Sequence, residues 1–129
     1  MYSLTSRSYL KVAHSLKGDI FGPSQLVHVI TYEVDTTYVT EALDEHNLII
    51  DFDVAQRTLE NLLSRMNFKN LDDLPEFKNV NTTTECLCRH LHDRMAERLG
   101  DRFRGTLTVT LRESPIAWAS YEAPIGGGA

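Results

Sequence analysis

Cysteine and histidine, the side chains that most often bind zinc, gather in one short run, Cys86-Leu87-Cys88-Arg89-His90-Leu91-His92. On a helix the pairs Cys86/His90 and Cys88/His92 are each four residues apart, so either pair could supply two metal ligands. The two pairs point about 160° apart by helix geometry, which excludes a single four-ligand site. We therefore interpret the run as one half-buried helix surface.

Glu113 is the carboxylate with the most informative position. Leu107, Val109 and Leu111 alternate with threonines, which predicts a strand with one apolar face, and Glu113 continues that face. A carboxylate there is costly unless it is paired or meets the hydrogen-bond donors of a ligand. The alternative is that Glu113 sits in water at the end of its strand.

His14 and His28 are further candidates for acid–base work. Both lie in segments rich in β-branched and aromatic residues, which predict strands over residues 7–14 and 27–39. Lys17-Gly18-Asp19 and Gly22-Pro23-Ser24 between them predict a wide turn, so the two segments form a long hairpin. A lone strand histidine is more often satisfied by neighbouring backbone than bound to metal.

Two amphipathic helices follow the hairpin. Asp53 and Gln56 make a capping-box pattern that starts a helix over about 54–66, and Thr82 and Glu85 make a second one. The second helix is expected to stop at Gly100, and residues 71–78 form the loop between the two. A second hairpin follows, with strands over residues 106–111 and 116–122.

The order β-β-α-α-β-β predicts an α+β fold in which an antiparallel four-stranded sheet carries two helices on one face. Residues 1–122 are expected to form a single domain, and residues 123–129, with three consecutive glycines, a flexible C-terminal tail. The opposite face of the sheet, which carries no helix, is expected to be covered as well.

The charge and composition of the chain limit the classes of partner that we expect. A net charge of -5 and a pI near 5.5 argue against a nucleic-acid partner. The chain has no apolar run long enough for a signal peptide or a bilayer span, so we expect no membrane partner and a cytoplasmic location. Cys86 and Cys88 lie two apart on a predicted helix, so no disulfide framework is indicated.

Six segments, in order, resemble the family of 6-pyruvoyl-tetrahydropterin and 6-carboxytetrahydropterin synthases over residues 8–122. They are Val12-Ala13-His14-Ser15-Leu16, residues 26–32, Ile50-Asp51-Phe52, residues 71–77, residues 81–85, and Leu111-Arg112-Glu113-Ser114 followed by Trp118. The chain resembles a divergent member. The resemblance implies the tunnelling fold, in which sheets join edge to edge across subunits of a homo-oligomer, a trimer or hexamer, into a barrel with ligand pockets at the interfaces.

The resemblance also implies a zinc ion held by three histidines, at His14, His28 and position 30. Position 30 is Ile30, which cannot ligate. Residues 28 and 30 project from the same face of a strand, so that face presents an imidazole and a hydrocarbon. Two histidines should bind zinc much more weakly than three unless another group joins them.

Other positions of the family's site have changed as well. The family's reactive cysteine falls on Ser24, which lacks the low pKa of a thiol. Its Leu-Asp-His falls on Met66-Asn67-Phe68, and neither an amide nor a benzene ring can shuttle a proton. The family's glutamate that accepts hydrogen bonds from the N–C–N edge of a pterin falls on Glu113, and Thr83 matches a further binding position.

Three functions fit these residues. The first is an altered lyase or cyclase that binds a small molecule against Glu113 and Thr83, lined by Ile30 and Phe68, with His14, His28, Tyr32 and Ser24 as the remaining catalytic candidates. The second is the ordinary zinc-dependent reaction that the resemblance implies, elimination or side-chain cleavage on a dihydropterin triphosphate. The third is a non-catalytic binding or assembly protein.

Overall fold

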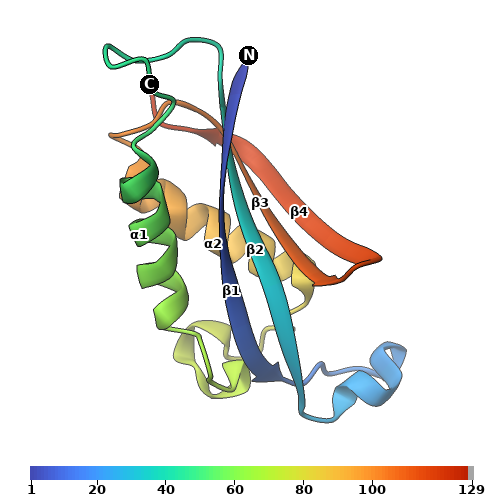
Figure 1. The fold of residues 1–129 in the computed structure, drawn as a ribbon. Helices are drawn as coiled ribbons and strands as arrows, with labels where there is room; N and C mark the ends of the chain where they lie inside the picture. Colours follow the sequence, from blue (N-terminus) through green and yellow to red (C-terminus); the bar gives the residue numbers. More distant parts are fainter. Residues whose placement is uncertain (128–129) are drawn as a thin grey trace.

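The computed structural model describes residues 1–127 as a four-stranded antiparallel sheet with two α-helices on one face (Figure 1). The strands follow the order β1-β2-β3-β4 across the sheet. Their bounds are β1 Tyr2–His14, β2 His28–Thr40, β3 Gly105–Ser114 and β4 Ala117–Ile125. The predicted α+β fold, with two helices on one side of a four-stranded antiparallel sheet, is confirmed.

The long hairpin of β1 and β2 dominates the sheet and reaches past β3 and β4. Its register runs without a break from Tyr2 opposite Thr40 to His14 opposite His28. The first strand begins five residues before the predicted start at residue 7, because residues 2–6 pair with residues 36–40. A 3-10 segment, η1 (Asp19–Gln25), occupies the wide turn between the strands.

Helix α1 (Phe52–Ser64) begins and ends two residues earlier than predicted. The predicted cap at Asp53 is wrong, because the carboxylate of Asp51 accepts from the backbone N–H groups of Asp53 and Val54. Gln56 does not complete a capping box; its amide donates to the carbonyl oxygen of Arg7 and so ties α1 to β1.

Helix α2 (Thr84–Leu99) ends before Gly100 as predicted. Its cap, however, is Thr83 and not Thr82, since the Thr83 hydroxyl accepts from the N–H of Cys86 at 3.2 Å. The loop that precedes it contains two short 3-10 turns, η2 (Leu71–Asp73) and η3 (Pro75–Phe77). The side chain of Thr82 is thereby left to contact the sheet.

The C-terminal boundary differs from the prediction. Strand β4 continues to Ile125, which pairs with Gly105 and is buried, so residues 123–125 belong to the sheet and not to a flexible tail. Gly126 follows with φ of 70°, and a side chain there would collide with the carbonyl oxygen of Phe103. Residues 128 and 129 of the predicted tail lie outside the described residues.

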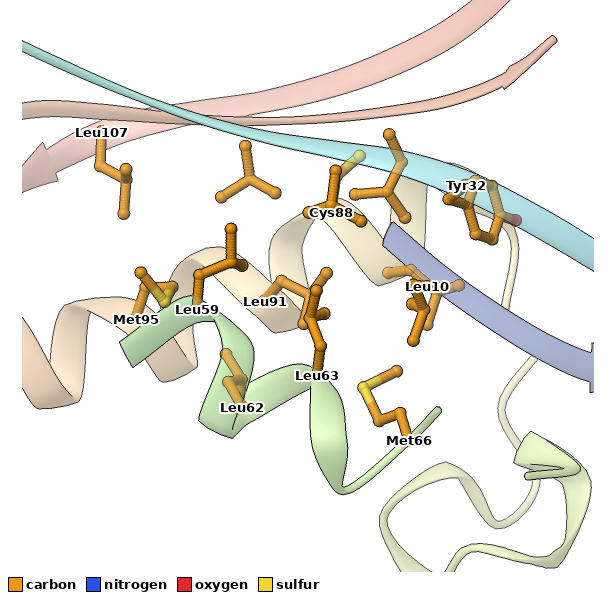
Figure 2. Packing of buried hydrophobic residues seen from close by; sticks show 14 of the residues in the cluster. Leu10, Tyr32, Leu59, Leu62, Leu63, Met66, Cys88, Leu91, Met95 and Leu107 are labelled. Atoms are coloured by element: carbon orange, nitrogen blue, oxygen red, sulfur yellow. The ribbon is translucent and has the colours of Figure 1, made fainter. Parts of the chain in front are cut away.

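The core lies between the helices and the sheet. Helix α1 packs against β1, and α2 packs across β3 and β4. Figure 2 shows leucines of both helices, together with Met95 of α2 and Met66 just after α1, in the cluster beside the strands. Tyr32 lies beside Leu10 at one end of the cluster, and Leu107 lies near the other. The described residues contain no helix long and apolar enough to cross a membrane.

Candidate functional site

His14 and His28 meet where the two longest strands end. His14 is the last residue of β1 and His28 the first of β2, and they are directly paired in the register. Both side chains lie on the sheet face that the helices cover, because they share the parity of the buried residues Val12 and Tyr32. The ring centroids are 4.6 Å apart and the planes are inclined by 60°.

Each imidazole is held by a hydrogen bond through Nδ1. The His28 Nδ1 lies 2.9 Å from the carbonyl oxygen of Leu26, which can only accept, so Nδ1 carries the proton and Nε2 of the neutral ring keeps a free lone pair. The His14 Nδ1 lies 2.9 Å from the hydroxyl of Thr82. Burial, and then the neighbouring His28 ring, lower the pKa of His14, so this ring favours its neutral form.

Ile30 occupies the next position on the same face of β2. It is half-buried, packs against the core and lies opposite Val12 on β1. Its side chain offers neither nitrogen, oxygen nor sulfur to an ion. Within residues 1–127 no three His, Cys, Asp or Glu side chains are grouped so that they could hold a metal ion. The donor set therefore does not fit the three-ligand zinc centre that the resemblance implies.

Tyr32 follows Ile30 on this face and is fully buried. Its hydroxyl is 3.1 Å from that of Thr84, in the first turn of α2. Burial raises the pKa of Tyr32 to about 12, the hydrogen bond to Thr84 opposes this, and the charge of Glu113 adds to the rise. The Tyr32 phenol therefore keeps its proton at neutral pH and remains a hydrogen-bond donor.

Glu113 lies near Tyr32, at the end of β3. The β3–β4 register shifts between Arg112 and Ser114, so Glu113 is the additional residue of a β-bulge, and its side chain is exposed in the single chain. It lines a depression of about 470 Å³ together with Thr84 and Trp118. The carboxylate is thus open to a ligand and is not buried in the apolar layer.

The three threonines before and at the start of α2 have separate roles. Thr82 contacts His14, Thr83 caps the helix and Thr84 contacts Tyr32. From the sequence, only Thr83 was expected at the ligand site and Thr82 was expected to cap the helix, whereas the Thr83 hydroxyl oxygen is the one that the helix engages. The missed residues are Thr82 and Thr84, and the run of three threonines before an apolar periodicity was the available signal.

Ser24 lies apart from this cluster in the connection between β1 and β2. Its carbonyl oxygen accepts from the N–H of Leu16 at 2.9 Å, which anchors η1 beside the end of β1. In the part of the chain that the structure describes, the Ser24 hydroxyl makes no hydrogen bond with His14 or His28. Among the described residues, neither histidine is therefore placed to activate this serine as a base.

Phe68 is also outside the cluster. The Asn67 amide accepts from the N–H of Lys11 and donates to the carbonyl oxygen of Tyr9, so the segment closes the free edge of β1. Phe68 itself has φ of 63° and is 83% exposed. It borders a shallow hollow with Val29, on the sheet face away from the helices. Within one chain it does not line a pocket with Glu113.

The Cys and His residues of α2 are spread over the helix surface, as predicted. The Cys88 thiol donates to the carbonyl oxygen of Ala119, and burial raises its pKa to about 11. His92 is buried and bonds through Nε2 to the carbonyl oxygen of Ala123. Cys86 and Cys88 are both free thiols. These contacts hold α2 on β4 and form no metal site among the described residues.

Comparison with known proteins agrees with this architecture. The family described as 6-pyruvoyl tetrahydropterin synthase matches residues 3–124. The 6-carboxy-5,6,7,8-tetrahydropterin synthase of Bacillus subtilis is 22% identical over 130 residues, which cover 98% of this chain and 88% of the relative.

Solved structures of the same family superpose over nearly the whole chain. The 6-pyruvoyl tetrahydropterin synthase of Caenorhabditis elegans gives a TM-score of 0.83 at 17% identity, covering 95% of each chain. The enzyme of Plasmodium vivax gives 0.79 at 15% identity, covering 96% of this chain and 98% of its own. At these identities the structures establish the fold alone, whereas the family match spans most of the chain, so this protein belongs to the 6-pyruvoyl tetrahydropterin synthase family.

Proposed function

We propose that the protein is an altered lyase or cyclase on the pterin-synthase scaffold. It binds a small flat heterocycle through Glu113 and acts on it with protein acid–base groups in place of a three-histidine zinc centre. The observation that carries the proposal is the row on the helix-facing side of β2, where His28, Ile30 and Tyr32 follow one another between His14 and Glu113. Two imidazoles and one phenol thus share a face of the sheet with the hydrocarbon of Ile30, and Glu113 lies beyond Tyr32.

Glu113 is suited to ligand recognition by its exposure and its chemistry. A carboxylate accepts two hydrogen bonds side by side, which matches the paired N–H donors at the edge of an amino-substituted nitrogen heterocycle. The bulge turns the residue toward the depression that Trp118 also lines. A flat ligand in this depression can contact the indole while its polar edge meets the carboxylate.

His14 and His28 are suited to proton transfer, and Tyr32 is suited to donating a hydrogen bond. The free Nε2 of His28 is the base, because its Nδ1 proton is held by the Leu26 carbonyl oxygen. Tyr32, with its pKa of about 12, keeps its proton and donates its hydrogen bond to Thr84, which lines the depression and can in turn donate to a ligand oxygen that gains charge. Ile30 makes the floor between them apolar, so we expect a substrate whose reacting side chain is less polar than a pterin triphosphate.

The proposal includes a homo-oligomer, a trimer or hexamer, with the active site completed at subunit interfaces. Two features support it: β4 has an open edge, and the sheet face away from the helices is uncovered in the single chain. That face contains the buried carboxylate of Asp35 between Arg7, at 2.7 Å, and Arg112, at 3.6 Å. Ser24 and Phe68 then reach a site only from a neighbouring copy.

The ordinary zinc-dependent reaction is the alternative that one observation favours. Metal-ligating histidines usually donate their second ring nitrogen to a carbonyl or another acceptor. The bond from His28 to Leu26 has this form. The alternative needs a third ligand, and Ile30 does not provide one.

Binding and turnover of nitrogen heterocycles by protein stripped of metal test the proposal. Pterins and purines with and without oxygenated side chains are titrated calorimetrically against the wild type, Glu113→Gln and Glu122→Gln. Glu122 is an exposed carboxylate on β4, bonded to Thr108 and outside the depression, so it is the matched control. Loss of a charged hydrogen-bond acceptor is worth about 1.5–3 kcal/mol, which predicts roughly 10- to 100-fold weaker binding for Glu113→Gln only.

Mass spectrometry of the same mixtures separates an enzyme from a binding protein. New products formed by metal-free protein, and lost in His28→Ala, support acid–base catalysis. Products formed only after zinc is added support the ordinary reaction, and binding without products supports the non-catalytic function. Equal affinities of the wild type and Glu113→Gln for every heterocycle contradict the binding role of Glu113.

A further inference from the structure

Ile30 occupies the position beside His14 and His28 at which a third metal ligand would be needed. His14 and His28 are direct partners in the sheet, with ring centroids 4.6 Å apart. Position 30 is the next residue on the same face of the same strand, about 7 Å along β2 from His28. Side chains at these three positions share one face of the sheet, and His14 is bonded to Thr82, just before α2.

The two histidines are already prepared as ligands. The Nδ1 of His28 is bonded to a carbonyl oxygen and that of His14 to the Thr82 hydroxyl, so the Nε2 atoms are the nitrogens left for another partner. Such outer hydrogen bonds fix ring orientation, and losing one typically weakens metal binding by about 10- to 100-fold. Both outer bonds are present here, so the missing feature is a donor atom at position 30.

Ile30 also acts against a bound ion. Its side chain is half-buried and packs on the core, so it brings hydrocarbon to the place of the third ligand. Tyr32, the next residue on this face, does not compensate, because its hydroxyl is fully buried and is bonded to Thr84. A zinc ion held by two imidazoles alone would have two of its four positions without a protein ligand.

We infer that Ile30 is the residue that keeps this site free of tightly bound zinc, and that one nitrogen or sulfur ligand at position 30 is sufficient to create a metal site with His14 and His28. The inference extends the proposed function, and it depends on that function only in assuming that the reaction proceeds without metal. The argument from the ligand atoms and their geometry does not depend on the proposed function.

Metal binding by a small set of variants tests the inference. Wild type, Ile30→His and Ile30→Cys are stripped with a chelator and titrated with zinc, and with cobalt, whose visible absorption reports tetrahedral coordination. Val29→His and Val29→Cys are the matched controls, because Val29 is the adjacent residue, is 63% exposed and projects from the opposite face. We expect both Ile30 variants to bind one ion per chain at least ~100-fold more tightly than the wild type and the controls.

Two results would overturn the inference. The first is wild-type protein that keeps one zinc per chain against the chelator and loses it in His14→Ala, since a third ligand would then come from elsewhere in the assembly. The second is folded Ile30→His and Ile30→Cys that bind no better than the Val29 variants. Cysteine is smaller than isoleucine, so Ile30→Cys avoids the overpacking that histidine can cause.

The metal result is separable from the proposed function. If zinc binding follows the expectation but metal-free wild type binds no heterocycle, the proposed function fails and the assignment of Ile30 stands. If heterocycles bind through Glu113 but wild type also holds zinc tightly, the assignment of Ile30 fails and the ordinary zinc-dependent reaction is favoured.

Discussion

Tyr32 and Tyr38 lie six residues apart on the same face of β2, and both are fully buried. Burial raises the pKa of each to about 12. Their hydroxyls differ: that of Tyr32 is bonded to Thr84, whereas that of Tyr38 lies near the Thr36 side chain but makes no hydrogen bond of normal geometry among residues 1–127. The Tyr38 ring packs edge-on against Phe103. Equal burial therefore accompanies two different environments, and the polar partner distinguishes them.

The same contrast extends along the strand. At the site end of β2, meaning His28, Ile30 and Tyr32, the hydroxyl of Tyr32 is bonded to Thr84 at the start of α2. His28 lies against His14, which is itself bonded to Thr82. The core end of β2, meaning Val34, Thr36 and Tyr38, faces the apolar layer of β3 and the helices. The polar groups at the site end thus have hydrogen bonds of about normal length, whereas the core end depends mainly on packing and its Thr36 hydroxyl makes only a long bond to Ser6 of β1.

The largest expected effect is on the free energy of unfolding at alkaline pH. Because folding raises the tyrosine pKa from 10.0 to about 12, both protons stay on the folded chain while an unfolded chain loses them. Their contribution is complete below pH 10 and is lost as the pH rises toward 12, roughly 3 kcal/mol for each tyrosine. Urea unfolding at a series of pH values should show a shallower fall for Tyr32→Phe and for Tyr38→Phe than for the wild type.

The charge of Glu113 distinguishes the two tyrosines in the same experiment. It raises the pKa of Tyr32 but is not among the causes for Tyr38. In Glu113→Gln the tyrosinate absorbance of Tyr32 should appear at lower pH, while that of Tyr38 stays in place. Phenylalanine variants that lose stability with alkali as steeply as the wild type would assign this loss to other groups, such as Cys88, whose pKa is about 11.

Truncation of one aliphatic side chain at each end should give the next largest difference. Val34 is fully buried, so Val34→Ala loses two methyl groups and leaves a cavity, at a cost of about 2 kcal/mol. Ile30 is half-buried beside an open site, and Ile30→Ala should cost about half as much although it removes more atoms. Denaturant midpoints of the two variants measure this, and an equal loss would mean that Ile30 is covered by a neighbouring copy.

Threonine-to-valine changes compare the hydroxyl groups of the two ends. Thr82→Val leaves the buried Nδ1 of His14 without a partner, which should lower the free energy of unfolding by roughly 1–2 kcal/mol. Thr36 donates only a long bond of 3.4 Å to the carbonyl oxygen of Ser6, so Thr36→Val should cost less. Calorimetric unfolding checks the order, and a larger loss in Thr36→Val would contradict it.

The fold was predictable from the sequence because it depends on periodicity. Alternating Leu107, Val109 and Leu111 and the one-sided leucines of the helices define which faces are buried, and the structure places them there. Both helix caps were predicted at the wrong residue, Asp53 in place of Asp51 and Thr82 in place of Thr83. Neighbouring Asp or Thr residues are equally good cap candidates in a sequence, because the backbone conformation that selects one of them is not visible there.

The candidate site was predictable only in part, because its residues come from four elements. His14 and His28 could be paired, since consecutive strands of a hairpin bring their adjoining ends together. The contact between Thr82 and His14 joins residues 68 positions apart and depends on how α2 meets the sheet, which no local pattern contains. Phe68 fell outside the cluster because its φ of 63° directs the chain along the edge of β1.

Removing one hydroxyl from each tyrosine gives the smallest and most selective test. Tyr32→Phe breaks the bond to Thr84 and should cost about 1 kcal/mol at neutral pH. Tyr38→Phe removes a buried hydroxyl without a partner in residues 1–127, so stability should stay unchanged or rise slightly. Only Tyr32→Phe should alter turnover or ligand affinity. Equal losses in stability would mean that Tyr38 also has a polar partner, and the two ends of β2 would then differ in their position alone.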